Sequence, residues 1–247
     1  MNEDRRTLVE LHDVRFRYHR RSRWWERRPA DPADLECASL RVHPGLTLLL
    51  GPNGSGKSTL LKLLAGVESP ETGSIRIEGR DLWKEERDAR LGLAYVPEQP
   101  DLTPYAAVNE VIRLVCALRN APLAAGHRAL AMVGMEDLGH RSVRELSLGQ
   151  RRRVLFAAAF VGEPRVVLLD EPLVALDLGM RALVLTWLEQ RIRAGASAIV
   201  STHEIDPFLV LAENAVVMKR GRPTLFSLSG KESDRLAQLS GWARGEP

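Results

Sequence analysis

The sequence predicts an α/β protein whose core is a mostly parallel β-sheet. Compact apolar runs at 46–50, 166–170 and 198–201 are typical of strands that are buried on both faces. The segments 57–65 and 181–192 follow two of these runs and carry apolar residues at helical spacing. Strands that alternate with helices favour a parallel sheet, because the helices form the crossover connections.

The N-terminal region predicts an antiparallel β subdomain in front of this core. Apolar and polar residues alternate over 9–18, where we expect a strand pair, and a further short strand is expected at 40–42. Additional strands are expected at 75–77, 91–96 and 215–218.

The middle of the chain predicts a helical subdomain, inserted in the α/β domain at about residues 100–162. Apolar residues recur at helical spacing in 108–118, 127–133 and 148–161. The segment 229–247 is polar and only weakly periodic, and we expect it to be a loosely held C-terminal tail.

The composition is typical of a soluble globular protein. The chain has 247 residues, of which 45% are apolar and 27% charged, and this length suits a single domain over 1–247. No apolar run approaches the roughly 20 residues of a membrane-spanning helix, and the charged N-terminus lacks an apolar signal region. We therefore expect a cytoplasmic protein. Cys37 and Cys116 lie far apart, which excludes a disulfide framework and a cysteine-built zinc site, and both are expected to be buried.

A glycine-rich loop follows the first compact apolar run. The letters GPNGSGKS at 51–58 fit the phosphate-binding pattern G-x-x-x-x-G-K-[ST]. Its glycines let backbone N–H groups surround phosphate oxygens, Lys57 places a charge at the β- and γ-phosphates, and Ser58 offers a hydroxyl to Mg²⁺. Between a buried strand and a helix, this pattern predicts a P-loop NTPase with a RecA-like core. The predicted ATP-binding residues of this segment are Gly51, Pro52, Asn53, Gly54, Ser55, Gly56, Lys57, Ser58 and Thr59.

Two acidic residues end the apolar run at 166–170. Asp170 is placed to hold the Mg²⁺ shell, because carboxylate oxygens are preferred ligands of this ion. Glu171 follows it directly and is the candidate that orients or deprotonates an attacking water.

Three further segments resemble the motifs of ATP-binding-cassette (ABC) ATPases. Leu146-Ser147-Leu148-Gly149-Gln150 is similar to the LSGGQ signature of that family and precedes Asp170 at close to the family's usual interval. Ala175-Leu176-Asp177 resembles its D-loop, and Ser201-Thr202-His203 resembles its switch histidine. The motif order is kept over nearly the whole chain.

This resemblance implies a mechanism. Two cassettes would face each other head to tail around two ATP molecules, with Mg²⁺ as the metal ion. The signature residues Ser147, Leu148, Gly149 and Gln150 would contact the ATP held by the partner cassette. Glu171 would act as the general base, His203 would brace the γ-phosphate and the water, and Asp177 would couple the two sites.

The chain departs from the family pattern at three places. Leu148 stands where the signature has glycine. The glutamine that meets Mg²⁺ in the family corresponds by spacing to Glu98 and by chemistry to Gln99, so both are candidates. The aromatic residue that stacks on adenine corresponds to Tyr18, but 33 residues separate Tyr18 from Gly51. The extra length is an arginine- and tryptophan-rich loop over 19–28, so its Trp24 or Trp25 is an alternative.

The resemblance leaves several functions open. The first is the ATPase subunit of an exporter-like transporter, peripheral on the inner face of the cell membrane, with a separate membrane-spanning subunit and a second cassette that is identical or a close paralogue. The alternatives are an importer ATPase, a soluble cassette acting on ribosomes or DNA, and a regulatory module without turnover. No nucleic acid is expected as a partner, and the loop over 19–28 is expected to dock on a partner subunit or the membrane surface.

Overall fold

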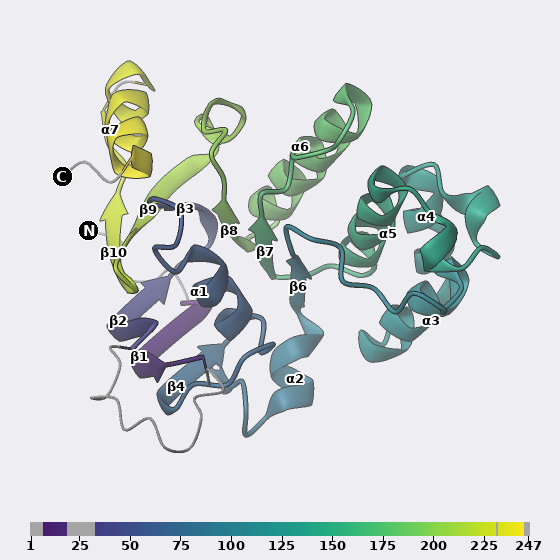
Figure 1. The fold of residues 1–247 in the computed structure, drawn as a ribbon, viewed down its shortest axis with the longest axis horizontal. Coiled ribbons are helices and arrows are strands. Elements are labelled where there is room, and N and C mark those ends of the chain that lie inside the picture. Colours follow the sequence, from purple (N-terminus) through teal and green to yellow (C-terminus); the bar gives the residue numbers. More distant parts are fainter. Residues whose placement is uncertain (1–6, 19–32, 231, 245–247) are drawn as a thin grey trace, which may run out of the picture.

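The computed structural model describes residues 7–18, 33–230 and 232–244 of the chain. It contains a four-stranded antiparallel sheet and a six-stranded, mostly parallel sheet, with a group of helices at one end of the molecule (Figure 1). The loop over 19–28, with Trp24 and Trp25, lies outside the described residues.

The six-stranded sheet has the order β10-β9-β3-β8-β7-β6. Its parallel strands are β3 (Gly45–Leu50), β6 (Leu93–Val96), β7 (Val166–Asp170), β8 (Ser197–Ser201) and β9 (Ala212–Lys219). Every residue of β3, β7 and β8 is buried, as the compact apolar runs predict. The expected strand at 91–96 is shorter than predicted, because Leu91 ends helix α2 (Glu86–Leu91).

The four-stranded sheet consists of β1 (Val9–Phe16), β2 (Leu35–Val42), β4 (Thr72–Ile77) and β5 (Arg80–Asp81). The alternation over 9–18 therefore marks one strand, and the expectation of a strand pair there was wrong. The partner of β1 is β2, whose register with β1 pairs Val9 with Val42 and Phe16 with Leu35. The inner face of this sheet packs on helix α1 (Lys57–Leu64) in a shared apolar cluster.

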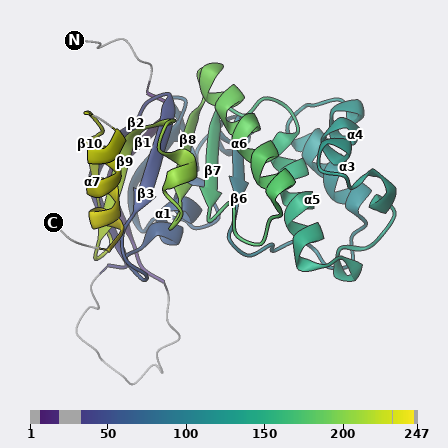
Figure 2. The same cartoon turned by 90° about the horizontal axis from the view of Figure 1, so that it is seen from above.

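Helices α3 (Val108–Leu118), α4 (Leu123–Met132) and α5 (Leu148–Phe160) pack on one another beyond the β6 edge of the large sheet (Figure 2). The guanidinium of Arg119 fixes this group to the sheet. It donates to the carbonyl oxygens of Ala158 and Val161 at the end of α5, at 2.8 and 2.7 Å, and to that of Leu93 in β6 at 3.1 Å. Burial lowers the pKa of Arg119 to about 10.

The C-terminal segment differs from its prediction. The residues after Ser229 form helix α7 (Glu232–Arg244), and β10 (Arg222–Ser227) precedes it. Leu239 and Trp242 of α7 are buried, and the Trp242 ring stacks on Phe226 of β10 at 4.7 Å. Only these two residues of α7 are buried, which is why the sequence shows so little periodicity there.

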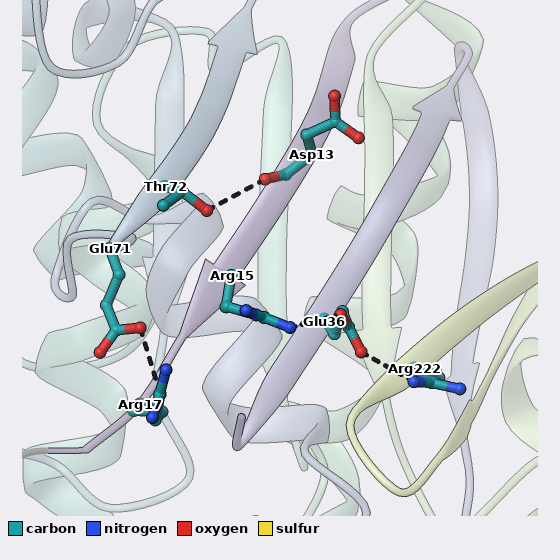
Figure 3. A network of polar contacts seen from close by, with 7 residues as sticks. All are labelled: Asp13, Arg15, Arg17, Glu36, Glu71, Thr72 and Arg222. Carbon is teal, nitrogen blue, oxygen red and sulfur yellow. Dashed lines mark hydrogen bonds and ion pairs between the residues drawn. The ribbon is translucent and has the colours of Figure 1, made fainter. Parts of the chain in front are cut away.

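Ion pairs join the two sheets where β2 lies beside β10 (Figure 3). Glu36 of β2 accepts from Arg15 at 2.9 Å and from Arg222 at 2.8 Å, and these bonds, with that to Arg222 the larger contribution, hold the pKa of Glu36 below its usual value. Gly221 makes the backbone connection: its oxygen accepts from Glu36 N, and its own N–H donates to Ser55 O in the glycine-rich loop. A Cβ at Gly221 would lie 2.4 Å from Asp34 O, so this junction requires glycine.

Both cysteines are buried and free, as predicted. Within the described ranges, no helix combines the length and the apolar character needed to cross a lipid bilayer.

Candidate active site

A cavity of about 570 Å³ opens at the carboxyl ends of β3 and β7. It brings together residues of the glycine-rich loop, the two acidic residues at the end of β7 and residues from four other segments. The lining residues are Tyr18, Asp34, Asn53, Gly54, Gly56, Lys57, Ser58, Thr59, Glu98, Asp170, Glu171, Ser201 and His203.

The glycine-rich loop has the backbone conformation that its glycines permit. Gly51, Gly54 and Gly56 have φ angles of 141°, 75° and 104°, values that strain most residues with a side chain. A Cβ at Gly51 would lie only 2.5 Å from Met218 O in β9. Gly56 leads directly into α1, whose first N–H groups have no side-chain cap and are therefore available to an anion.

Lys57 is held against this loop. Its Nζ donates to Gly51 O at 2.7 Å and to Pro52 O at 3.3 Å, and the residue is only 9% exposed. Burial lowers the pKa of Lys57, and the carboxylates of Glu171 and Asp170 counteract this effect. The loop therefore presents a fixed, partly desolvated ammonium group to the cavity.

Asp170 ends β7 and is 3% exposed. Glu171 follows with a φ of 46°, and its N–H donates to Ser201 O at 2.8 Å. The Glu171 side chain is 12% exposed, its Oε1 has no hydrogen-bond partner in the described part of the chain, and burial raises its pKa. A carboxylate with these properties is suited to accept a proton.

His203 is the neighbour of that carboxylate. Its backbone N–H donates to Glu171 Oε2 at 3.3 Å, and its Nε2 lies 3.5 Å from Glu171 Oε1. The side chain of His203 is about half exposed, so one side of the pair remains open to the cavity.

The two candidates after β6 occupy different positions. Glu98 lines both the cavity and the adjoining groove, whereas Gln99 lines only the groove, together with Ser58 and Asp170. Both residues therefore stay candidates for the Mg²⁺ position: Glu98 lines the cavity, and Gln99 shares the groove with the predicted metal ligands Ser58 and Asp170.

Tyr18 also lines the cavity. Its N–H donates to Asp34 Oδ2 at 2.8 Å, its hydroxyl lies 3.4 Å from Thr59 Oγ1, and its ring packs edge-on against Phe16. Asp34 was not predicted; it lines the cavity because it directly precedes β2, and its backbone oxygen lies beside Gly56 of the glycine-rich loop.

The signature residues lie outside the cavity, at the start of α5. Ser147 Oγ accepts from Gln150 N at 3.2 Å, and Gln150 Oε1 accepts from Ser147 N at 2.9 Å, which forms a capping box. Leu148 is 55% exposed. A Cβ at Gly149 would lie 3.9 Å from Ala175 O, so the signature adjoins the predicted D-loop.

Asp177 caps helix α6 (Leu178–Arg193) and does not line the cavity. Its Oδ1 accepts from Met180 N at 2.9 Å, and its Oδ2 pairs with Arg153 of α5. These contacts, with that to the Met180 N–H the larger one, lower the pKa of Asp177.

The sequence interpretation missed Arg152, which is 2% exposed and donates to the backbone oxygens of Glu98 and Glu171. Within the letters RRR at 151–153 it resembles part of a solvated helix face. Its spacing to Phe156 and Ala159 could have predicted its burial, because these three residues share one side of α5 and the other two are buried.

Comparison with known proteins identifies the family. The family model described as "ABC transporter" matches residues 35–174. The chain belongs to the ABC transporter family. Its fold agrees: a solved ATP-binding subunit of an ABC transporter superposes with a TM-score of 0.79 at 24% identity, over 95% of this chain and 100% of that one. A dimeric cassette in a post-hydrolysis state with ADP and Pi superposes with a TM-score of 0.75 at 23% identity, over 91% and 100%.

Curated ABC relatives are similar in sequence. The Fe(3+) ions import ATP-binding protein FbpC of Brucella abortus (strain 2308) is 40% identical over 188 residues, which is 74% of this chain and 53% of the relative. The spermidine/putrescine import ATP-binding protein PotA of Bacteroides thetaiotaomicron is 37% identical, over 78% and 42%. This ABC chain spans about half the length of these relatives. Both are named as import proteins, so they give no support to the expectation of an exporter.

Proposed function

We propose that this chain binds and hydrolyses ATP as the cassette of an import-type ABC transporter. The observation that carries the proposal is the cavity, in which a phosphate-binding loop faces the partly buried carboxylate of Glu171, whose pKa is raised by burial. Fold similarity alone does not give activity, but Lys57, Glu171 and His203 have the chemistry and the mutual geometry that hydrolysis needs.

The loop and α1 bind the phosphates in this proposal. Backbone N–H groups of the loop and the first turn of α1 surround the phosphate oxygens, and Lys57 places its charge at the β- and γ-phosphates. Tyr18, which also lines the cavity, provides an aromatic face for the adenine ring.

The oxygen donors of the site fit Mg²⁺. Ser58 and Asp170 line both the cavity and the adjoining groove, and a hydroxyl with a carboxylate is a donor set that this ion accepts. When bound there, the ion would neutralise charge on the phosphate oxygens. Gln99 and Glu98 are the further residues in reach of this position.

Glu171 performs the proton transfer. It takes one proton from a water whose oxygen attacks the γ-phosphorus, and the bond from that phosphorus to the β–γ bridging oxygen breaks, so that ADP leaves. His203 braces the same water and the γ-phosphate. The raised pKa of Glu171 increases its affinity for the proton.

The signature acts in trans in this proposal. Ser147 to Gln150 lie outside their own chain's cavity, and Leu148 is exposed, so these residues are available to an ATP held by a second cassette, identical or paralogous. Asp177, which adjoins the signature through Arg153, would lie at the same interface.

Import is the favoured direction because the curated relatives named above are import proteins. Their cargoes differ, ferric ions in one case and polyamines in the other, at nearly equal identity, so the similarity does not select a cargo. The chain would work with a separate membrane-spanning subunit on the cytoplasmic face of the membrane, which agrees with the absence of a membrane-crossing helix from its described residues.

Affinity purification from detergent-solubilised membranes tests the assembly. We expect a membrane-spanning subunit to copurify with the tagged chain, and ATP hydrolysis by the purified complex. Copurification of ribosomal proteins would instead support a soluble cassette, and absence of ATP hydrolysis from the complex would contradict the proposed activity. In proteoliposomes, movement of cargo away from the cassette side would contradict import.

A further inference from the structure

Arg152 is a buried charge that the mechanism above does not use. It lies in the second turn of α5, five residues after Ser147, and is 2% exposed, less than Asp170 at 3% and Lys57 at 9%. Burying a guanidinium is costly unless its donors are satisfied, so its partners indicate its role.

Two backbone oxygens receive the hydrogen bonds of this guanidinium. Nη2 donates to Glu171 O at 2.6 Å, and Nη1 donates to Glu98 O. Arg152 thereby joins three segments that are distant in sequence: the signature helix α5, the segment after β6 and the turn after β7. The carboxylates of Glu98, Asp170 and Glu171 offset the electrostatic cost of its burial.

The hydrogen bond from Arg152 stabilises an unfavourable backbone conformation at Glu171. A φ of 46° lies in the left-handed region, which residues with a side chain adopt only when their surroundings impose it. The Glu171 N–H is held by Ser201 O and the Glu171 carbonyl by Arg152, so both peptide groups of the residue are fixed. The direction of the carboxylate follows from this turn.

We propose that Arg152 is a positioning residue that holds the Glu171 backbone in the turn which directs its carboxylate into the cavity. The proposal rests on the function proposed above, in which Glu171 is the base. It does not give Arg152 any contact with ATP, because Nη1 and Nη2 donate to protein backbone, Nε is buried without a partner among the described residues, and Arg152 does not line the cavity. A displaced turn would move the carboxylate relative to the attacking water while leaving the phosphate-binding loop in place.

Two substitutions and one matched control test this role. Arg152→Met removes both donors at similar volume, and Arg152→Lys keeps the charge but cannot span both oxygens with a planar fork. Arg119→Met is the control, because Arg119 is also buried and also donates to backbone oxygens of α5 and β6, but it has no contact with Glu171. Thermal unfolding and binding of a fluorescent ATP analogue establish that each variant is folded.

The rates are measured as steady-state ATP hydrolysis at saturating ATP, which gives kcat. For Arg152→Met we expect a loss of roughly ten- to hundredfold in kcat, the range for residues that support a catalytic group, with little change in ATP affinity. Arg152→Lys should recover part of kcat. Arg119→Met should lower thermal stability and leave kcat close to that of the unmodified chain.

A double-mutant cycle separates positioning from general stabilisation. In the Glu171→Gln background the base is already absent, so Arg152→Met should cause little further loss of the residual rate. The proposal would be overturned if the rate loss in the double variant equalled the product of the losses in the two single variants. A fall in kcat for Arg119→Met as large as that for Arg152→Met would also overturn it. If Arg152→Met does not fold, Arg152→Lys in the same cycle decides. An inactive unmodified complex would instead contradict the proposed ATPase, which is a distinguishable outcome.

Discussion

Replacing Glu171 by glutamine removes the proposed base with almost no change of shape. Among the described residues, the carboxylate Oε1 has no hydrogen-bond partner and Oε2 accepts only from the His203 N–H, a bond that a glutamine oxygen can keep. ATP binding should therefore persist. Loss of a general base costs about 10²- to 10⁴-fold in rate, which corresponds to about 3 to 5 kcal/mol in the activation free energy.

The raised pKa of Glu171 adds a pH signature. Only the deprotonated carboxylate accepts a proton, so kcat of the unmodified protein should fall as the pH decreases, beginning at a higher pH than for an ordinary glutamate. A folded pKa above the unfolded one means that the folded state loses stability as the pH rises through the folded pKa. Glu171→Gln cannot ionise, so it should be more stable than the unmodified protein at neutral pH, and this difference should shrink in acid.

Phosphate release, size-exclusion chromatography with ATP, and thermal unfolding at several pH values measure these effects. Glu204→Gln is the control, because Glu204 pairs with Arg181 and its carboxylate does not line the cavity. The Glu171→Gln variant should accumulate as an ATP-bound dimer. Hydrolysis at the unmodified rate would refute the assignment of the base, and a variant that binds ATP but elutes only as a monomer would contradict dimerisation by the chain alone.

Three other substitutions test different parts of the molecule. Lys57→Ala should weaken ATP binding by about ten- to hundredfold, as for loss of charged hydrogen bonds, and unchanged affinity in filter binding would remove Lys57 from the site. Ser147→Arg should leave ATP binding nearly intact and abolish steady-state turnover, because Ser147 lies outside its own cavity; loss of binding would contradict a role in trans. Trp242→Ala should lower the free energy of unfolding by about 3 kcal/mol, since the ring is buried and stacked on Phe226, and an unchanged urea midpoint would show that α7 contributes nothing.

The parts of the fold that the sequence predicted well are those whose cause is local. A strand buried on both faces has to be apolar at every position, so β3, β7 and β8 are visible as compact runs. The glycine-rich loop is visible for a similar reason, because Gly51 cannot carry a Cβ so close to Met218 O.

The missed parts depend on tertiary contacts. The edge strand β10 exposes most of its residues and so has no alternating pattern, and its place is set by pairing with β9. Asp34 reaches the cavity through the turn of Gly221, a contact between segments almost 190 residues apart. Arg152 was missed because it is the middle one of three consecutive arginines, 151–153, and the sequence of such a run does not show which arginine is buried.

The charges around the cavity indicate the form in which a nucleotide would bind. Two cations, Lys57 and Arg152, interact with the same three carboxylates, those of Glu98, Asp170 and Glu171. The described residues that surround the site therefore carry a net negative charge, which by itself disfavours a triphosphate. No group of three or more histidine, cysteine, aspartate or glutamate residues suited to hold a metal ion occurs in the described part of the chain. Such a site matches a Mg²⁺ complex of ATP, in which the phosphates supply ligands and the ion supplies the missing positive charge.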